Sequence, residues 1–393
     1  MKQGDALSLP KGWEIKRLND VSVNLDNKRV PITKNIRNEG SIPYYGASGI
    51  VDYVADYLFD EDLLCVSEDG ANLLARTYPI AFSISGKTWV NNHAHVLKFR
   101  NSTTQKFIEI YLNSIKLDDF VSGMAQPKLN QTMLNKIPIP LPPLPEQQRI
   151  VAIIDEAFAA IAKAKANAEQ NLKNAKELFD VYLHKYYTSK EEGWEERNLK
   201  EVAEYFNGLT YSPKDVSNKG IIVLRSSNVQ NDELDFNDIV RVNLKVKEKI
   251  VVKDGDILMC SRNGSARLVG KTATIKGLNE EMTFGTFMMI IRSQYNQYLS
   301  WFFKSTDFRN QIKNGENTMI NQITRYMLDD IVLSFPPIDK QNEIVQKLDA
   351  LSDEIKKLET IYKQKISDLE ELKKSVLQKA FNGELKTATV SVA

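Results

Sequence analysis

Two stretches of the chain carry polar loops whose side chains could hydrogen-bond to the edges of DNA bases. Arginine and lysine can donate to guanine, asparagine and glutamine can pair with adenine, and serine or threonine hydroxyls read bases less strictly. The first set comprises Lys28, Arg29, Tyr44, Tyr45, Ser48, Lys87, Trp89, Asn91, Asn92 and His93. The second set comprises Tyr211, Arg225, Ser227, Asn228, Arg262, Asn263, Ser265 and Arg267. Each loop taken alone is more typical of a solvated turn, but their recurrence at matching places along the chain favours DNA reading.

The sequence lacks the patterns of common catalytic and metal sites. It holds no P-loop, no Gly-x-Gly-x-x-Gly and no His-Glu-x-x-His, and its cysteines lack zinc-ligand spacing. His93 and His95 would share one face of a strand, as metal ligands can, but no third ligand lies nearby, which favours polar contacts between loop and strand. We therefore expect no catalytic residue, no metal site and no cofactor bound by this chain.

Composition describes a soluble globular protein of more than one domain. The 393 residues are 42% hydrophobic and 26% charged, and no apolar run approaches the 18 residues of a membrane span. The polar start is not a signal peptide, and the single cysteines Cys65 and Cys260 are typical of buried thiols in a reducing cytoplasm. The net charge of +1 gives weak support for nucleic-acid binding, so a DNA role would need local basic loops or charge from partner subunits.

The chain contains the same unit twice, which decides the fold prediction. The segment Gly12–Glu14 recurs as Gly193–Glu195, an offset of 181 residues, whereas Asp62–Leu64 recurs in Asp256–Leu258 at an offset of 194. The second copy is therefore 13 residues longer, and the extra residues lie between its Trp194 and its Asp256. Matches in the same order on two consistent offsets exclude chance.

Each copy ends in a predicted long helix. After Pro145 and after Pro337 the chain has no glycine or proline until Gly193 and Gly383, and its apolar residues follow the alternating spacing of a coiled coil. The expected seam includes Ile150, Ile154, Ile161, Asn171 and Leu178 in the first helix, and Ile344, Leu348, Ile355, Lys365 and Leu372 in the second.

The two seams predict that the helices pair with each other. The first seam is rich in alanine and the second in leucine, and complementary sizes favour packing together. Antiparallel pairing would return the second helix to the first copy and give a pseudo-two-fold repeat. Asn171 and Lys365 fall at equivalent seam positions, where a polar residue either fixes the register or merely lies at a solvated gap.

The rest of each copy is predicted to be an α+β domain. Short β-like runs such as residues 62–66 and 94–99, or 220–225 and 286–291, alternate with turns. Helical stretches at 104–115 and 295–303 follow the last run of each copy. We name residues 1–145 head 1 and residues 189–337 head 2.

The arrangement resembles the specificity (S) subunit of type I restriction–modification enzymes over nearly the whole chain. The resemblance is carried by Leu9–Trp13, by Gly193-Trp194, by the helix entry Ile137–Gln148 and by the ending Leu377–Leu385. The second helix entry departs from the pattern, with Ile338-Asp339-Lys340 where the first has Leu144-Pro145-Glu146, which puts a specific role of Glu146 in doubt.

The resemblance implies two α/β target-recognition domains joined by two long antiparallel coiled-coil helices. The expected boundaries are 1–145 and 189–337 for the recognition domains, 146–188 and 338–383 for the helices, and 384–393 for a C-terminal tail. In that family each head reads one half of a bipartite, asymmetric site in double-stranded DNA, and the helices set the spacer and bind two modification (methyltransferase) subunits. Restriction subunits, which are translocases with nuclease activity, join through these. S-adenosylmethionine, ATP and Mg²⁺ would be bound by the partner subunits, so the chain itself is expected to be non-catalytic and cytoplasmic, with no membrane partner.

Two other functions are compatible with the residues. A free-standing bivalent regulator would bind specific DNA without a methyltransferase. A structural scaffold would retain no DNA in a sequence-dependent way, even with an adenine methyltransferase present.

Overall fold

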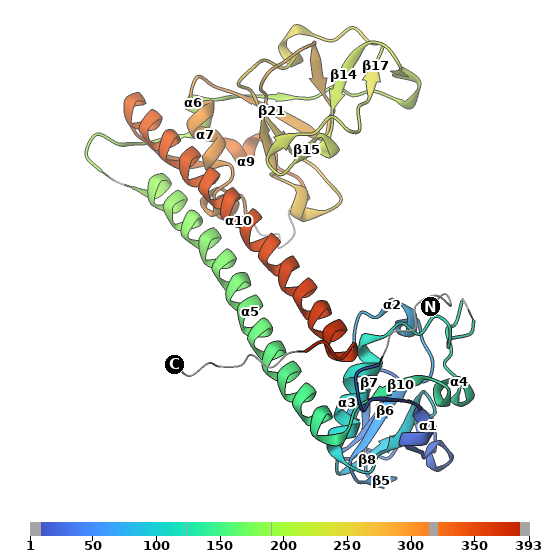
Figure 1. The fold of residues 1–393 in the computed structure, drawn as a ribbon. Helices are drawn as coiled ribbons and strands as arrows, with labels where there is room; N and C mark the ends of the chain where they lie inside the picture. The colour runs from blue at the N-terminus through green and yellow to red at the C-terminus, as the bar shows by residue number, and fades with distance from the viewer. Residues whose placement is uncertain (1–8, 124, 190, 314–320, 386–393) are drawn as a thin grey trace, which may run out of the picture. The chain divides into compact units, whose positions relative to one another are not determined.

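The computed structural model describes residues 9–123, 125–189, 191–313 and 321–385 (Figure 1). The chain divides into two compact units. The first unit holds head 1 with the beginning of the first long helix and the end of the second. The second unit holds residues 169–363, and thus head 2 with the other halves of both helices. Of the predicted tail, residues 386–393 lie outside the described part.

Head 1 consists of two four-stranded sheets and a short ribbon. The first sheet has the order β2 (Val23–Asn24), β9 (Ala94–Lys98), β6 (Leu63–Ser67), β7 (Ala81–Ile84). The second has the order β4 (Gly49–Val54), β3 (Ile42–Gly46), β8 (Lys87–Val90), β5 (Phe59–Asp60). The ribbon pairs β1 (Glu14–Arg17) with β10 (Pro138–Leu141). The helices are α1 (Leu18–Val21), α2 (Asn72–Ala75), α3 (Ser102–Ser114) and α4 (Gln131–Asn135), with 3-10 turns at Asp26–Lys28 and Lys34–Ile36.

Head 2 repeats this plan. Its sheets have the orders β12 (Glu204–Asn207), β21 (Met288–Arg292), β18 (Ile257–Cys260), β19 (Thr272–Thr274) and β13 (Val216–Ser217), β17 (Arg241–Val242), β14 (Ile221–Leu224), β20 (Met282–Phe284). The ribbon is β11 (Glu195–Asn198) with β22 (Val332–Phe335). The helices are α6 (Leu199–Val202), α7 (Asn296–Phe302), α8 (Thr306–Lys313) and α9 (Arg325–Asp329), and 3-10 turns lie at Pro213–Asp215, Ser226–Asn228, Glu248–Ile250 and Ala266–Leu268.

The two heads share their strand framework. In each head a central strand of the first sheet, β6 or β18, is buried along its whole length. In each second sheet one pair of strands is parallel, β3 with β8 and β14 with β20. The hairpin β15 (Val229–Gln230) and β16 (Glu233–Leu234) lies in the stretch where the second copy is longer. The predicted α+β repeat is confirmed.

The long helices are α5 (Leu144–Thr188) and α10 (Ile338–Phe381), and both begin in the same way (Figure 1). The buried Gln147 side chain donates to the Pro142 carbonyl at 2.8 Å, and Gln341 donates to the Pro336 carbonyl at 2.8 Å. A carbonyl next to the first turn of a helix has few partners, and a buried one costs free energy unless it is bonded. This requirement explains why the glutamine occurs in both copies while the residues before it differ.

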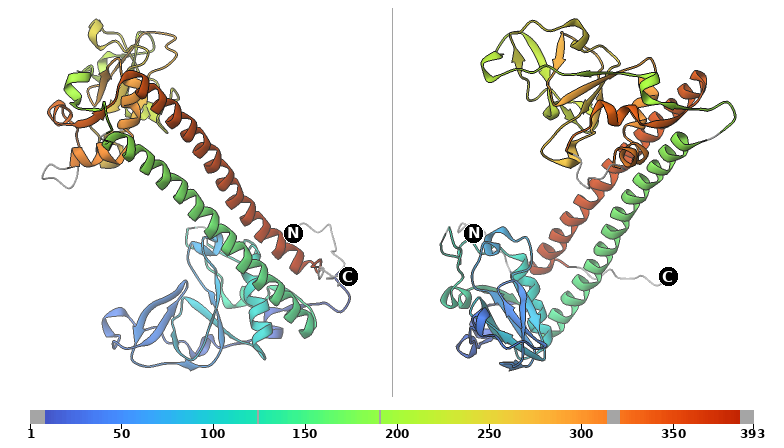
Figure 2. Two further views of the ribbon diagram at one scale, coloured as in Figure 1. Left: turned by 90° about the vertical axis from the view of Figure 1, so that its left-hand side faces the viewer. Right: turned by 180° about the vertical axis from the view of Figure 1, so that it is seen from behind.

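In the first unit α5 and α10 lie side by side and antiparallel (Figure 2). Arg149 donates to the Leu385 carbonyl, the ammonium of Lys373 lies 4.8 Å from the centre of the Phe158 ring, and Lys165 pairs with Glu370 at 2.7 Å. The residue numbers of the α10 partners decrease as those of α5 increase, so the two helices run antiparallel here. In the second unit Lys176 pairs with Glu359 at 3.1 Å.

The helix ends complete the cores of the heads. In the first unit the Phe381 ring, from the last turn of α10, packs edge-on against Phe107 and Tyr111 at 5.3 and 5.0 Å between centroids. In the second unit Tyr187, from the last turn of α5, packs on Tyr298 and Phe302 at 4.9 and 5.2 Å. Tyr187 and Phe381 are 194 residues apart, which is the offset of the repeat. Each head therefore closes its core with the end of the helix that begins in the other copy.

The seam follows the expected spacing over only part of each helix. Ile150, Ile154, Ile161, Ile344 and Leu348 are buried and Ile355 is half-buried. The other expected seam residues, Asn171, Leu178, Lys365 and Leu372, are exposed.

At several places the inward-facing residue is instead the next one along the helix. In α5 Leu172, Phe179 and Leu183 are buried or half-buried, and in α10 Ile366 is half-buried where Lys365 was expected. Ala175, Tyr362, Leu369 and Val376, which continue the original spacing, are half-buried as well. A straight helix with 3.6 residues per turn drifts about 20° per heptad relative to a strict seven-residue pattern. Over several heptads this drift moves the buried stripe to the neighbouring residue.

No helix in the described part of the chain is long and apolar enough to cross a membrane.

The observed burial predicts that two leucines of α5 contribute very differently to the free energy of unfolding. Leu183→Ala removes a side chain that is 1% exposed in the head 2 core, and we expect it to lower the free energy of unfolding by about 3 kcal/mol. Leu178→Ala, at a site 53% exposed, should change it by less than about 0.5 kcal/mol. Urea unfolding of both full-length variants measures the difference; similar losses for the two would contradict the observed register.

Candidate nucleic-acid interface

Head 2 has an open cleft that gathers three of the predicted polar loops. Residues from 209–213, 225–227 and 262–264 line it, together with the turn 285–288, and its volume is about 1120 Å³. Of the predicted residues it contains Tyr211, Arg225, Ser227, Arg262 and Asn263. Loops far apart in sequence meet here because strands β12, β14, β18 and β21 end at this place.

A close approach of two glycines builds the wall of the cleft. A Cβ on Gly208 would lie 2.2 Å from the Gly285 carbonyl oxygen, so only glycine fits there. The neighbouring Leu209 N–H donates to the Phe284 carbonyl at 2.7 Å, and the Gly285 N–H donates to the Leu224 carbonyl at 2.9 Å. These bonds hold the loop after β12 against the turn after β20.

One side of the cleft has hydrogen-bonding capacity that is not used internally. The Arg225 guanidinium pairs with Asp238 at 2.6 Å, but its Nε and the Ser227 hydroxyl are buried without a partner among the described residues. The buried Asn228 instead organises the turn, because it accepts from the Arg225 N–H and donates to the carbonyls of Asp235 and Asp238. Asn228 is thus structural, whereas Arg225 and Ser227 face the cleft.

The opposite side of the cleft is cationic and aromatic. The exposed Arg262 guanidinium lies 5.6 Å from the centre of the Phe287 ring. Asn263 donates to the Ser226 hydroxyl at 3.1 Å and accepts from the Ser265 N–H, so it ties this loop to the first. Arg267 is exposed and Ser265 half-buried in the same loop, outside the residues that line the cleft.

In head 1 five of the predicted residues are exposed, namely Lys28, Ser48, Lys87, Asn92 and His93. The Lys87 ammonium lies 4.8 Å from the centre of the Tyr57 ring, and the Ser48 hydroxyl is 3.2 Å from that of Tyr78. Trp89 is half-buried and donates to the Val30 carbonyl at 2.7 Å. These exposed side chains can meet a ligand.

The other head 1 candidates belong to the interior. Tyr44 is 1% exposed and its hydroxyl accepts from the Ile32 N–H at 3.0 Å. Asn91 is buried and accepts from the His93 N–H, and Tyr45 packs on Phe82 at 5.9 Å between centroids. A polar residue next to a turn was expected to face solvent, but in these loops it satisfies the backbone instead.

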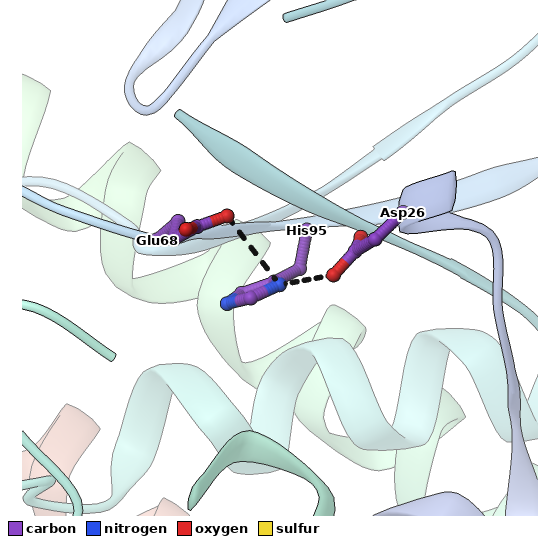
Figure 3. A group of neighbouring side chains, drawn as sticks. All are labelled: Asp26, Glu68 and His95. Atoms are coloured by element: carbon purple, nitrogen blue, oxygen red, sulfur yellow. Dashed lines mark hydrogen bonds and ion pairs between the residues drawn. The ribbon is translucent and has the colours of Figure 1, made fainter. Parts of the chain in front are cut away.

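Arg29 is also internal, and it belongs to a charge network with Asp26, Glu68 and His95. Figure 3 shows the two carboxylates and the imidazole of this network. Its guanidinium donates to Glu68 at 2.7 Å and to the Ala94 carbonyl, and lies 3.4 Å from Asp26. The buried His95 ring has Asp26 at 2.6 Å on Nδ1 and the Leu129 carbonyl at 2.7 Å on Nε2. Each ring nitrogen of His95 therefore lies within hydrogen-bonding distance of an oxygen atom.

The network has the ligand types of a metal site, since oxygen and nitrogen atoms of Asp26, Glu68 and His95 lie within 4.8 Å of one another. However, Arg29 and the Lys128 ammonium, 3.2 Å from Glu68, already take the place of a cation. Burial alone would raise the pKa of Asp26, but the hydrogen bond and charge of His95, the Val96 N–H and Arg29 together hold that pKa below its usual value. The pKa of Glu68 is lowered against burial in the same way by Arg29, His95 and Lys128.

The repeat carries two functional candidates that loop composition did not reveal. Phe287, which is 56% exposed, lies in an apolar run that predicts a strand rather than a loop. Asp69 is acidic and so differs from the basic and amide side chains expected to read bases. Aligning the copies could have found Phe287, because at the offset of 194 it matches His93, a residue of the first polar set.

Each copy of the repeat joins an α+β head with exposed polar loops to one long helix. The family model described as the type I restriction modification DNA specificity domain matches the chain twice, over residues 10–173 and 191–367. The chain therefore belongs to the family of type I restriction–modification specificity subunits, which are non-catalytic DNA specificity proteins.

Known relatives span the whole chain. The specificity subunit of the type I restriction enzyme EcoKI of Escherichia coli is 26% identical over 96% of this chain and 90% of its own length. Among solved structures, a chain from a study of assembly and conformational transition of the type I restriction–modification system is 19% identical and has a TM-score of 0.73, covering 96% of this chain and 99% of that one. The specificity subunit from Thermoanaerobacter tengcongensis is 18% identical with a TM-score of 0.59, covering 96% and 98%. At these identities the structures support the fold.

The charge network predicts how head 1 responds to acid. Because Asp26 and Glu68 have lowered pKa values in the folded state, the stability they contribute is present above the usual carboxyl range and is lost as pH falls through the lowered values. Asp26→Asn should lower the free energy of unfolding by about 3 kcal/mol at pH 6, and the gap to wild type should narrow toward pH 3. Urea unfolding at both pH values tests this, with the exposed Asp119→Asn as control; a gap independent of pH would contradict it.

Proposed function

We propose that head 1 and head 2 each read one half of a bipartite, asymmetric target in double-stranded DNA. The observation that carries this proposal is that the heads keep one strand framework while their exposed loop residues differ. A shared framework would present both heads to DNA in the same manner, and different loops would read different bases. Two identical heads would instead predict a palindromic target.

The helices would set the spacer between the two half-sites. Each is continuous, over 45 residues in α5 and 44 in α10, and each end is fixed in the core of a head. Rigid elements between two reading surfaces fix the distance between the sites that they address. With a net charge of +1, the chain would obtain much of its attraction to phosphates from partner subunits.

Apolar side chains exposed on the helices support docking of two methyltransferase subunits. In the second unit Leu178, Val181 and Tyr182 of α5 and Leu358 and Ile361 of α10 are exposed. In the first unit Leu372 is 50% exposed, and it is the residue that corresponds to Leu178 at the repeat offset of 194. Large apolar side chains on an otherwise polar helix surface are typical of a protein interface.

The repeat thus offers one such position to each of two identical partners. Restriction subunits would join through the methyltransferases, and S-adenosylmethionine, ATP and Mg²⁺ would be bound by these partners. The complex would act in the cytoplasm.

Methylation mapping tests the proposal directly. The chain is co-expressed with its methyltransferase, and methylated adenines are located in genomic DNA. We expect a bipartite motif with one methylated adenine per strand, whereas a continuous motif or no methylation would refute the proposal. Tight specific binding by the isolated chain would favour the free-standing regulator, and no sequence-dependent DNA retention by the complex would favour the scaffold.

If the exposed leucines dock the methyltransferase subunits, a charge at either leucine should impair the binding of one subunit and leave the other bound. Leu178→Glu and Leu372→Glu should each weaken binding of one methyltransferase subunit by about tenfold or more, since burying a leucine is worth about 1.5–3 kcal/mol. Gln170→Glu is the matched control, because it places the same carboxylate on an exposed polar position of α5. Titration of the purified chain with methyltransferase, followed by mass photometry, measures the stoichiometry. Unchanged binding in both leucine variants would place the docking surface elsewhere.

A further inference from the structure

Two pairs of side chains occupy the same place in the two heads. In head 1 the pair is Asp69 with His93, and in head 2 it is Arg262 with Phe287. Asp69 forms an isolated antiparallel bridge with Lys128, and Arg262 forms one with Gln322. Lys128 and Gln322 each stand two residues before a helix cap, Asn130 for α4 and Thr324 for α9, whose side chains accept from the N–H three residues on.

The second members of the pairs correspond in the same way. His93 ends the turn before β9 and its carbonyl accepts from the Glu68 N–H at 2.8 Å. Phe287 ends the turn before β21 and its carbonyl accepts from the N–H of Ser261, the residue that corresponds to Glu68, at 3.0 Å, and also from the Arg262 N–H at 3.1 Å. The backbone pairing is therefore equivalent at both places, and the heads differ in the side chains that it presents.

The chemistry of the two pairs is opposite. In head 1 the two Asp69 carboxylate oxygens lie 3.0 and 2.8 Å from His93 Nδ1, so the Asp69 side chain, which is 23% exposed, is an acceptor beside an imidazole that is 52% exposed. In head 2 the Arg262 guanidinium lies over the exposed Phe287 ring and has no carboxylate partner among the described residues. Head 2 thus presents donors where head 1 presents an acceptor.

This difference indicates which part of the DNA the position would contact. A position that contacts phosphates would not carry a carboxylate in either head, because like charges repel. Base edges in the major groove offer both donors and acceptors, so a position that reads them can hold either charge. Arginine binds guanine O6 and N7, and a carboxylate accepts from the cytosine amino group.

We propose that these pairs are the specificity-determining contacts at one corresponding position of each half-site. Arg262 reads a guanine, with Phe287 holding the guanidinium plane and offering an apolar surface to the neighbouring base. Asp69 reads a cytosine, with His93 orienting its carboxylate. Both heads then select a G·C pair at this position, but through opposite bases of the pair. The inference rests on the proposed function, since it assigns residues to the reading that the heads perform.

Methylation by the complete complex on a randomised DNA library tests the assignment. Arg262→Gln should shift one position of the head 2 half-site from guanine toward adenine, because glutamine pairs with adenine, with a change in preference of about 10- to 100-fold. Asp69→Asn should change one position of the head 1 half-site by a similar factor. In each case the other half-site serves as an internal control and stays unchanged.

Matched variants separate reading from folding and from charge. Arg267→Gln removes an exposed arginine from the same loop, and we expect it to weaken methylation of all sequences evenly. Arg262→Lys keeps the charge and should retain guanine with a smaller preference, and thermal unfolding verifies that each variant is folded. An unchanged motif in Arg262→Gln and Asp69→Asn, or an even loss over all sequences, would overturn the inference. A wild-type complex without a bipartite motif would instead overturn the proposed function.

Discussion

The structure depends on one constraint, which is that neither head closes its hydrophobic core with its own residues. Head 1 packs Ile150 and Ile154 from the start of α5 together with Ala380 from the end of α10. Head 2 packs Leu183 and Tyr187 from the end of α5 together with residues from the start of α10. Because each core needs one end of both helices, the antiparallel pairing follows from core burial in the heads as well as from contacts along the helices. The ion pairs between the helices, such as Lys165 with Glu370, are partly exposed and contribute little to stability by comparison.

The same constraint separates the parts of the chain that can vary from those that cannot. The helix-start glutamines Gln147 and Gln341 satisfy a carbonyl in both copies, and the aromatic residues at the helix ends fill the same position of each core. In the loops after β6 and β18, the side chains of Asp69 and Arg262 fill no core and bond to no carbonyl among the described residues. Their side chains can therefore change from Asp69 to Arg262 without disturbing the backbone that holds them.

Much of the fold could be predicted from the sequence because the repeat supplies its own comparison. The anchors at Trp13 and Trp194, the strand after Asp62 or Asp256 and the glutamine at each helix start mark equivalent places whatever lies between them. The predicted seam holds over the first turns and departs at several later positions, since a strict heptad pattern drifts along a helix with 3.6 residues per turn. Leu178 and Leu372 were therefore expected inside and are exposed.

The reading residues could be predicted only in part. Composition singled out Arg262 and Arg225 as DNA-binding candidates, and the structure places both in the lining of a cleft; their contact with DNA stays a prediction. Composition could not distinguish an exposed arginine from the internal Arg29. Arg29 is internal because it bonds to Asp26, Glu68 and the Ala94 carbonyl, and most of these partners are distant in the sequence. Composition does not single out Asp69, since an acidic side chain is an unusual choice beside DNA, and only its structural match with Arg262 suggests a role.

The shared cores also fix the order of events during synthesis. N-terminal domains generally fold first as the chain leaves the ribosome, but the core of head 1 includes Ala380 and Phe381, which are among the last described residues. Head 1 must therefore wait for nearly the entire chain, and head 2, whose residues follow α5, can close before it. A chain cut short by a premature stop codon in α10 would expose the unfinished core of head 1 to cellular proteases. Folding of head 1 therefore depends on translation that reaches the last turn of α10.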